Sequence, residues 1–283
     1  RVYGYENIPD DYTSGRLKML ALPETRRPRF AVYNEMAARG YREVVSYAFV
    51  DEQWELDFAA NANPIRLQNP LAAQYAVMRS TLIGGLVEVL QNNLNRKQNR
   101  VRVFEIARVF SKGSDGRFVQ NERIGGLWYG AAMPEQWGEK TRNADFYDIK
   151  ADVENLLKNK AVEFVKTEHP ALHPGRATNI VSDGQIIGFV GELHPKWLQK
   201  YDLPQAPLVF EIDMAAVLER EKTRYQAVSK FQPVRRDLAF VMPEAMTHDD
   251  LLVALKGAAN KLVQEISVFD VYRGTGLPEG MKS

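Results

Sequence analysis

The stretch from residue 69 to residue 110 constrains the fold of this chain more than any other. It contains an Asn-Pro turn, an amphipathic helix, a short basic connection and a strand. The apolar residues of the helix recur at three- and four-residue steps and form one stripe, made of Leu82, Ile83, Leu86, Val87, Leu90 and Leu94. The strand that follows is too rich in aliphatic and aromatic side chains for a surface ribbon. We therefore expect one of its faces to meet this helix and the other to meet a second layer.

Helices and strands flank this unit on both sides. The segment 6–28 is rich in proline, glycine and charge and predicts a surface linker. Before residue 69 we expect a helix at 29–39 ended by Gly40, a strand at 41–50, a short helix capped by Asp51, and a strand at 65–68. After residue 110 we expect an Asp-Gly hairpin, a strand at 123–129, a helix at 145–158 and a strand at 162–167. An irregular segment at 169–176 should follow, and then a hairpin of 177–181 with 185–190. A helix from Pro195 and a strand at 207–212 complete the series. Hairpins with interspersed helices indicate an α+β domain on a largely antiparallel sheet.

Composition limits the classes that remain. The 283 residues leave room for about two domains. The absence of cysteine excludes disulfides and thiolate metal sites and fits a reducing cytoplasm. No apolar run approaches the roughly 20 residues that a membrane-spanning helix needs, so we expect no membrane role.

The net charge of +1 argues against a polycation that binds nucleic acid with its whole surface. Two segments nevertheless concentrate positive charge. Residues 91–112 hold six basic residues against Glu105, and residues 220–236 hold six against Glu221. A solvated face is the ordinary explanation for such clusters, so they are leads only.

The final segment predicts a second, smaller domain. A strand at 237–242, a helix at 247–259 capped by Thr247 and a strand at 262–272 make a β-α-β series typical of the first half of a ferredoxin-like sandwich. The chain begins at Arg1 rather than methionine and ends where another strand would be expected. We therefore expect a fragment of a longer polypeptide whose last domain is truncated.

Residue spacing gives no catalytic or metal site. Prolines follow His169 and His173, which breaks the helix that would align them, so histidines bonded to the backbone are favoured over a ligand pair. Glu192 is better explained as a buried or capping carboxylate than as a catalytic group. Phosphate-binding loops, nucleophile elbows and dinucleotide fingerprints are absent from the sequence. Gly84 and Gly85 lie within a helix, where a packing contact explains them better.

The clearest lead to a ligand is in the last segment. Residues 230–236 interleave cations with Phe231, and residues 268–274 place acidic, aromatic and basic groups near one sheet edge. Aromatic rings stack on unpaired bases, and arginines meet phosphates. Asp270 and Tyr272 are two apart, so on a strand they would face the same way. RNA binding and a half-buried edge strand with a solvated arginine both remain open on these grounds.

Eight short stretches, taken together, resemble a known family, the β subunits of bacterial phenylalanyl-tRNA synthetases. They occur in the family's order and span nearly the whole chain. The stretches are RVYGYENIP (1–9), QNPL (68–71), MRSTL (78–82), FEIARVF (104–110), HPGR (173–176), GELHP (191–195), FQPVRRD (231–237) and VFDVYRG (268–274).

The resemblance implies an architecture. Residues 1–22 would be the tail of a B5-type module and its linker. Residues 23–222 would be a class II synthetase-like core that keeps the fold of a catalytic domain without its activity. Residues 223–283 would be the first part of a ferredoxin-fold anticodon-binding domain. The family's magnesium-binding carboxylates and its editing site would lie upstream of Arg1, so no metal ligand is carried over.

The residues themselves agree that the core is inert. Class II catalysis uses an Arg-x-Glu pair whose side chains share one face of a strand. Arg102 and Glu105 are three apart, which predicts opposite faces. The sequence also lacks a glycine-rich strand that ends in arginine before a helix, because Gly188 and Gly191 lead into Glu-Leu-His-Pro instead. We expect no catalytic residue in this chain.

The resemblance further implies a role in charging tRNA(Phe) with phenylalanine, as a ligase subunit inactive by itself. The partners would be the α subunit, in a cytoplasmic α2β2 assembly, and tRNA(Phe); ATP and Mg²⁺ would serve the whole assembly, with no cofactor in this fragment. Tyr272 would stack on an anticodon base, with Asp270 accepting hydrogen bonds from that base and Ser283 adjacent. Arg235, Arg236 and Arg273 are candidate phosphate contacts on electrostatic grounds. The alternatives are a free-standing class II-like adenylating enzyme and an interaction scaffold without an RNA role.

Overall fold

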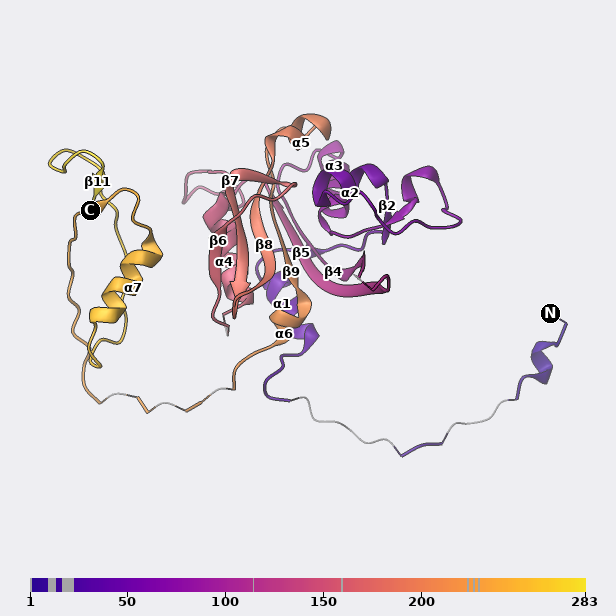
Figure 1. The fold of residues 1–283 in the computed structure, drawn as a ribbon, viewed down its shortest axis with the longest axis horizontal. Coiled ribbons are helices and arrows are strands. Elements are labelled where there is room, and N and C mark those ends of the chain that lie inside the picture. The colour runs from indigo at the N-terminus through magenta and orange to yellow at the C-terminus, as the bar shows by residue number, and fades with distance from the viewer. Residues whose placement is uncertain are drawn as a thin grey trace. The chain divides into compact units, whose positions relative to one another are not determined.

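The computed structural model describes residues 2–9, 14–16, 23–113, 115–158, 160–222, 224–225, 227–228 and 230–283. The chain forms two compact units, residues 1–223 and residues 224–283, and each is described by itself (Figure 1). The predicted B5-type tail at 1–22 lies partly outside the described residues. Its described part contains one short 3-10 helix, Tyr5–Asn7.

A seven-stranded sheet forms the centre of the first unit. In spatial order its strands are β1 (Arg42–Glu43), β4 (Val101–Lys112), β5 (Phe118–Tyr129), β9 (Leu208–Asp213), β8 (Gln185–Leu193), β7 (Leu172–Ser182) and β6 (Glu163–Lys166). Strand β1 runs parallel to β4, and every other neighbouring pair is antiparallel. The largely antiparallel sheet and the mixed α+β class are therefore confirmed.

Helices cover both faces of this sheet (Figure 1). One face, called here the α1 face, packs against α1 (Arg29–Ala38), α4 (Phe146–Leu156) and α6 (Met214–Leu218). The other, the α3 face, packs against α2 (Glu52–Ala59), α3 (Ile83–Asn95) and α5 (Pro195–Lys200). Along β4, Phe104 joins the core under α1 and Val103 joins the core under α3. That alternation follows from the two-residue period of a strand.

The apolar stripe of α3 is confirmed as the central packing element. Ile83, Leu86, Val87 and Leu90 are at most 1% exposed. Full burial of such a side chain stabilises the fold by about 1.5–3 kcal/mol, as an upper bound. A Cβ on Gly84 would lie 2.6 Å from the Trp54 ring of α2, so the glycine allows the two helices to approach closely.

Several of the predicted helix starts are also confirmed. The side chains of Asp51, Asp145 and Thr247 accept hydrogen bonds from backbone N–H groups in the first turns of α2, α4 and α7 (His248–Ala258). Such caps satisfy donors that have no partner within the helix. Gly40 has φ +82°, a left-handed conformation that favours glycine just after a helix.

The single strand expected at 41–50 is wrong. The chain leaves β4 after β1, where the Val44 N–H donates to the Phe104 carbonyl over 2.9 Å. It then turns away because the Ser46 N–H and hydroxyl both donate to the Glu105 carboxylate. Its continuation β2 (Phe49–Val50) pairs with β3 (Val77–Met78) in a separate two-stranded sheet, preceded by the 3-10 helix η2 (Ala73–Tyr75).

Three other expectations need correction. The strand expected at 65–68 is reduced to one bridge between Arg66 and Val77. The segment expected to be irregular at 169–176 contributes to β7, which begins at Leu172 and changes register before Ala177. The end of the predicted linker is packed rather than exposed: Arg27 is 8% exposed and donates to the Leu156 carbonyl.

The second unit contains the predicted helix as α7, but not the predicted strands. Its two strands are β10 (Met242–Pro243) and β11 (Met281–Lys282), which pair antiparallel. The segments 237–242 and 262–272 do not form strands, apart from Met242 in β10. Extended segments need a hydrogen-bonded neighbour to be stable, and these two do not pair with each other in the described part of the unit.

Candidate functional site

A buried ion pair lies on the α3 face where the core meets β2. Glu105 accepts hydrogen bonds from the Ser46 hydroxyl (2.6 Å) and pairs with Arg79 (3.1 Å). Both charged side chains are at most 5% exposed. Arg79 also donates to the backbone carbonyls of Tyr47 and Arg108. These contacts join three chain segments, those around Ser46, Arg79 and Glu105.

A second carboxylate on this face is held in the same way. Glu211 in β9 accepts hydrogen bonds from the Thr81 hydroxyl (2.6 Å), the Leu82 N–H (2.8 Å) and the Arg123 guanidinium (2.8 Å). Its side chain is 0% exposed. Glu211 thus fixes the first turn of α3 against the sheet, at a position where the N–H groups of a helix otherwise lack partners.

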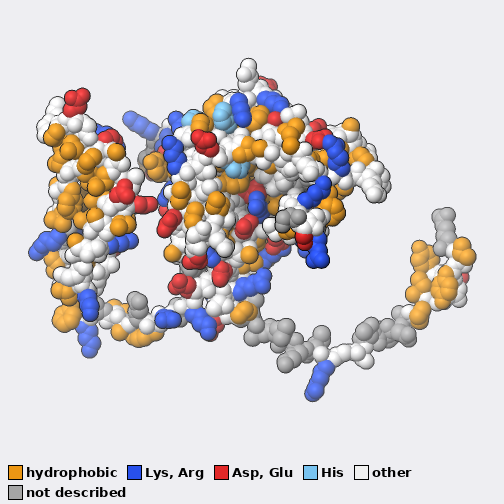
Figure 2. Space-filling model, in the orientation of Figure 1, with side chains coloured by type: hydrophobic (Ala, Val, Ile, Leu, Met, Phe, Trp, Pro, Cys, Tyr) orange, Lys and Arg blue, Asp and Glu red, His pale blue; other side chains and the backbone are white. Residues whose placement is uncertain are grey.

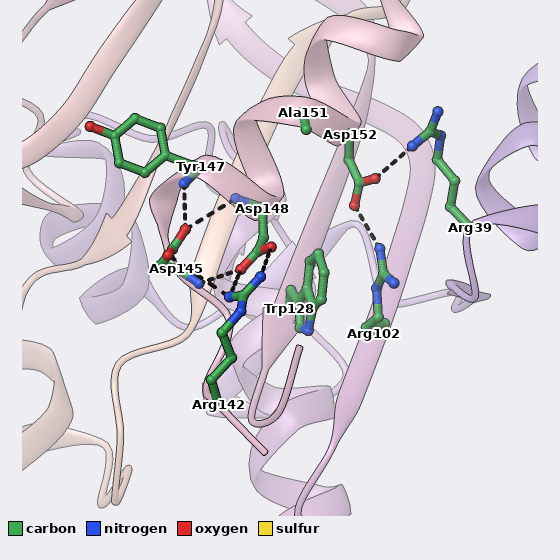
Figure 3. Close-up of a pocket in the computed structure, with 9 residues that line it drawn as sticks. All are labelled: Arg39, Arg102, Trp128, Arg142, Asp145, Tyr147, Asp148, Ala151 and Asp152. Atoms are coloured by element: carbon green, nitrogen blue, oxygen red, sulfur yellow. Dashed lines mark hydrogen bonds and ion pairs between the residues drawn. The ribbon is translucent and has the colours of Figure 1, made fainter. Parts of the chain in front are cut away.

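A cavity with a volume of about 420 Å³ lies on the α1 face (Figure 3). Arg39, Arg102 and Arg142 line it, together with Trp128 and the carboxylates of α4 and its cap. Arg142 makes two hydrogen bonds to Asp148, at 2.6 and 2.7 Å. These bonds raise the pKa of Arg142 and lower the pKa of Asp148. Neither group is poised to exchange a proton near neutral pH.

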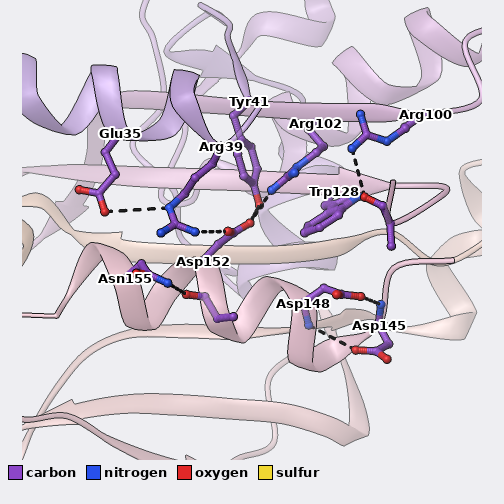
Figure 4. A network of polar contacts seen from close by, with 12 residues as sticks. Glu35, Arg39, Tyr41, Arg100, Arg102, Trp128, Asp145, Asp148, Asp152 and Asn155 are labelled. Carbon is purple, nitrogen blue, oxygen red and sulfur yellow. Dashed lines mark hydrogen bonds and ion pairs between the residues drawn. The ribbon is translucent and has the colours of Figure 1, made fainter. Parts of the chain in front are cut away.

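Asp152 is the centre of the polar network beside this cavity (Figure 4). It accepts from Arg39 (2.9 Å), Arg102 (2.6 Å) and the Tyr41 hydroxyl (2.9 Å). The Arg102 guanidinium lies 3.6 Å from the Trp128 ring centroid and 4.4 Å from that of Tyr41, a double cation–π contact. Burial and the Asp152 charge raise the pKa of Tyr41. The network binds α1 and α4 to the sheet.

The predicted separation of Arg102 and Glu105 is confirmed. Arg102 bonds to Asp152 on the α1 face, whereas Glu105 bonds to Ser46 and Arg79 on the α3 face. The two side chains cannot act on one substrate.

His169 and His173 accept hydrogen bonds from the backbone of their own segment. The Nδ1 atom of His169 accepts from the Ala171 N–H, and that of His173 accepts from the Gly175 N–H. Among the described residues, no group of three His, Cys, Asp or Glu is placed to hold a metal ion. Glu192 pairs with Arg176 at 2.7 Å. In the described part of the chain, no helix is long and apolar enough to cross a membrane.

The structure brings two of the predicted RNA-contacting residues together. Tyr272 and Ser283 exchange backbone hydrogen bonds, with the Tyr272 N–H donating over 2.6 Å and the Ser283 N–H over 3.0 Å. The Tyr272 side chain is 48% exposed, and its hydroxyl donates to the Thr275 carbonyl. Asp270 is exposed. The face expected to be shared by Asp270 and Tyr272 depended on a strand that is not formed.

The predicted phosphate-binding arginines are exposed and paired with carboxylates or backbone. Arg235 pairs with Asp237 at 3.1 Å, and Arg236 donates to the Arg235 carbonyl. Arg273 pairs with Glu244 at 2.8 Å, and its hydrogen bond lowers the pKa of that carboxyl. Exposed pairs of this kind contribute little to stability, so a phosphate can replace the carboxylate at little cost.

One aromatic residue of this surface was missed in the sequence. Phe269 is 67% exposed, and its ring centroid lies 5.5 Å from the Arg235 guanidinium. Hydrophobic side chains are visible over much of the second unit (Figure 2). The signal was present, because Phe269 lies between Val268 and Asp270 in one of the motifs.

Comparisons with known proteins agree with this division into units. Residues 8–214 match the family described as phenylalanyl tRNA synthetase beta chain CLM domain. Residues 229–283 match the ferredoxin-fold anticodon binding domain. The chain belongs to the phenylalanyl-tRNA synthetase β chain family.

Individual relatives support the same conclusion. The chain is 94% identical to a phenylalanine–tRNA ligase beta subunit of Neisseria gonorrhoeae over 283 residues, which is 100% of this chain and 36% of that protein. It is 55% identical, with the same coverage, to the phenylalanine–tRNA ligase beta subunit of Chromobacterium violaceum. The chain therefore spans about a third of the length of these relatives.

A solved pyrrolysyl tRNA synthetase from Desulfitobacterium hafniense overlaps 68% of this chain and 66% of its own. The TM-score is 0.48 and the sequence identity 11%, values at which the overlap does not define a shared fold.

Proposed function

We propose that this chain is the scaffolding and tRNA-binding portion of a phenylalanine–tRNA ligase β subunit. The α subunit supplies the adenylate chemistry in an α2β2 assembly that uses ATP and Mg²⁺ to charge tRNA(Phe) in the cytoplasm. One observation carries the proposal: the two family matches follow one another and together account for residues 8–214 and 229–283. The relatives are phenylalanine–tRNA ligase beta subunits, which supplies the subunit type.

The core, residues 23–222, is proposed to be a class II-like domain that does no catalysis. Its mostly antiparallel sheet between helices is compatible with that class. Stronger support comes from the charged groups. A catalytic site needs preorganised charges directed at the reacting atoms. Glu105, Arg79 and Glu211 are directed at other protein groups instead.

Residues 223–283 are proposed to bind the anticodon region, and residues 1–22 to be the tail of a B5-type module. Tyr272 offers a half-exposed ring for base stacking, beside Ser283. Asp270 would accept hydrogen bonds from that base, and Arg235, Arg236 and Arg273 would meet phosphates.

Replacing Tyr272 with alanine in the assembled ligase is expected to raise the KM for tRNA(Phe) about tenfold. Stacking of one base on an aromatic ring contributes about 1–3 kcal/mol, and about 1.4 kcal/mol corresponds to a factor of ten. Steady-state aminoacylation measures the change. Phenylalanine-dependent ATP–pyrophosphate exchange should keep its wild-type rate, because that step needs no tRNA.

Tyr147 provides a matched control, since it is a 75% exposed tyrosine of the core outside the proposed RNA surface. Tyr147→Ala should leave the KM for tRNA unchanged. A Tyr272→Ala enzyme with wild-type KM would argue for the interaction scaffold without an RNA role.

A further inference from the structure

A small pocket opens beside β2, on the same unit as the Glu105 ion pair but separate from the large cavity. Its volume is about 200 Å³. The chain segments that form it are β2 with the residues preceding it, the start of α2, η2 and the middle of α3. Four aromatic rings line it, those of Tyr47, Phe49, Trp54 and Tyr75. The Tyr47 ring stacks on Phe49 at 5.9 Å and meets Tyr75 at 5.2 Å.

The pocket also has two carboxylates and no cation. Asp51 and Glu88 line it, and none of the described lining residues is lysine or arginine. Asp51 already caps α2 through the Gln53 N–H at 2.8 Å. Glu88 is only partly exposed and, within the described chain, its side chain makes no hydrogen bond or ion pair. A partly buried carboxylate beside aromatic faces is a favourable environment for a positive charge.

The floor of the pocket is held in place by the buried ion pair. A Cβ on Gly85 would lie 2.5 Å from the Ser46 hydroxyl, so only glycine allows this close approach. Ser46 in turn donates to Glu105 and accepts from Arg79, at 2.6 and 2.8 Å. The floor of the pocket is therefore preformed, which lowers the cost of binding.

The rim is apolar and uncovered. Tyr47, which lines the pocket, is 61% exposed, and Val45, two residues before it on the same segment, is 88% exposed. Large apolar side chains that adjoin a pocket with an unpaired charge are typical of a protein interface with a polar anchor. A free inorganic cation would leave this apolar rim in water, whereas a protein partner covers it.

We propose that this pocket binds one arginine or lysine side chain of the α subunit and anchors the docking of that subunit. The cation lies against the faces of the aromatic rings and pairs with Glu88, while the apolar rim packs against the surrounding partner surface. This inference rests on the proposed function, since it takes the α subunit as the partner.

The test measures the dissociation constant of the complex between the α subunit and the full-length β chain. Glu88→Gln keeps the shape of the side chain and removes its charge, and it should weaken the complex about tenfold or more, as expected for truncating a close interfacial charge pair. The dissociation constant should also depend less steeply on salt concentration than in the wild type.

Tyr75→Phe should retain the affinity and Tyr75→Leu should lose it, because only an aromatic ring supports a cation–π contact. Glu163→Gln, on β6 at the opposite edge of the sheet, is the matched control and should bind like wild type.

Three other outcomes would overturn the proposed anchor. If wild-type chains associate and Glu88→Gln binds with the same affinity and salt dependence, the pocket is not an anchor, although the proposed function stands. If wild-type chains do not associate at all, the proposed function fails and this inference fails with it. If the β chain associates with itself and Glu88→Gln abolishes that contact, the occupant is a second copy and the assignment to the α subunit is wrong.

Discussion

Replacing Glu211 with alanine is expected to lower the free energy of unfolding of the core by about 3–5 kcal/mol, as for other buried ion pairs that lose one partner. The side chain is 0% exposed and accepts hydrogen bonds from three donors. Its removal leaves the Thr81 hydroxyl and the Leu82 N–H without their acceptor and the Arg123 guanidinium with a single carboxylate. Urea denaturation followed by tryptophan fluorescence measures the change, because all four tryptophans belong to the first unit.

Asp213 is the control, because it binds the same arginine from a more exposed position. It pairs with Arg123 at 3.0 Å, and its side chain is 39% exposed. Asp213→Ala should therefore cost only about 0–1 kcal/mol. Glu211→Gln keeps an acceptor oxygen and should lose less stability than Glu211→Ala but more than Asp213→Ala. It replaces Glu211→Ala in the comparison if that variant does not fold. If Glu211→Ala and Asp213→Ala lose the same free energy of unfolding, burial does not decide how much these carboxylates contribute to stability.

The core is expected to lose stability as the pH falls from 6.5 towards 4, and His169 is expected to cause a large part of this loss. Burial, with a contribution from the Arg123 charge, lowers the pKa of His169 from 6.5 to about 4. Above pH 6.5, His169 is neutral in both the folded and the unfolded state. Below it the unfolded state binds a proton that the folded state does not accept until about pH 4. The loss grows to the order of 3 kcal/mol, at about 1.4 kcal/mol for each unit of pKa difference.

His169→Asn is expected to remove this part of the pH dependence while keeping an acceptor for the Ala171 N–H. Urea midpoints between pH 7.5 and 4.5 measure the effect for each variant. His173→Asn, which removes the other histidine of the segment, should keep the contribution of His169. The account of His169 is wrong if His169→Asn and the wild type lose stability in parallel.

The centre of the fold could be predicted because two patterns there are strong and agree. The stripe from Leu82 to Leu94 has the period of a helix, and the density of apolar side chains from Val101 to Phe110 indicates a strand buried on both faces. Helix caps at Asp51 and Thr247 were equally predictable, since a cap is a local hydrogen bond.

Other elements depend on contacts that local pattern does not contain. The segment from Tyr41 to Val50 has the alternation of a strand, but Glu105, more than fifty residues away in sequence, draws Ser46 out of the sheet. The same long-range contact exposes Val45 and Tyr47. In the described part of the second unit, the two extended segments do not pair with each other, although Tyr272 exchanges backbone hydrogen bonds with Ser283.

The candidate sites also depend on contacts between residues that are distant in the sequence. Glu211 carried a sequence signal that was overlooked: a lone carboxylate within the apolar run of β9 must find donors if that strand is central. The aromatic pocket carried no such signal, because Tyr47, Trp54, Tyr75 and Glu88 are brought together only by the fold. The stacking role of Tyr272 came from the family resemblance and stays a prediction.

The central claim is that the core is a scaffold whose charged groups serve the fold rather than a substrate. Isothermal titration of the purified chain with Mg·ATP tests it most directly, with the α subunit titrated under the same conditions as the positive control. The expected result is no heat beyond dilution for this chain. Saturable binding of one ATP per chain would contradict the claim and favour the free-standing adenylating enzyme.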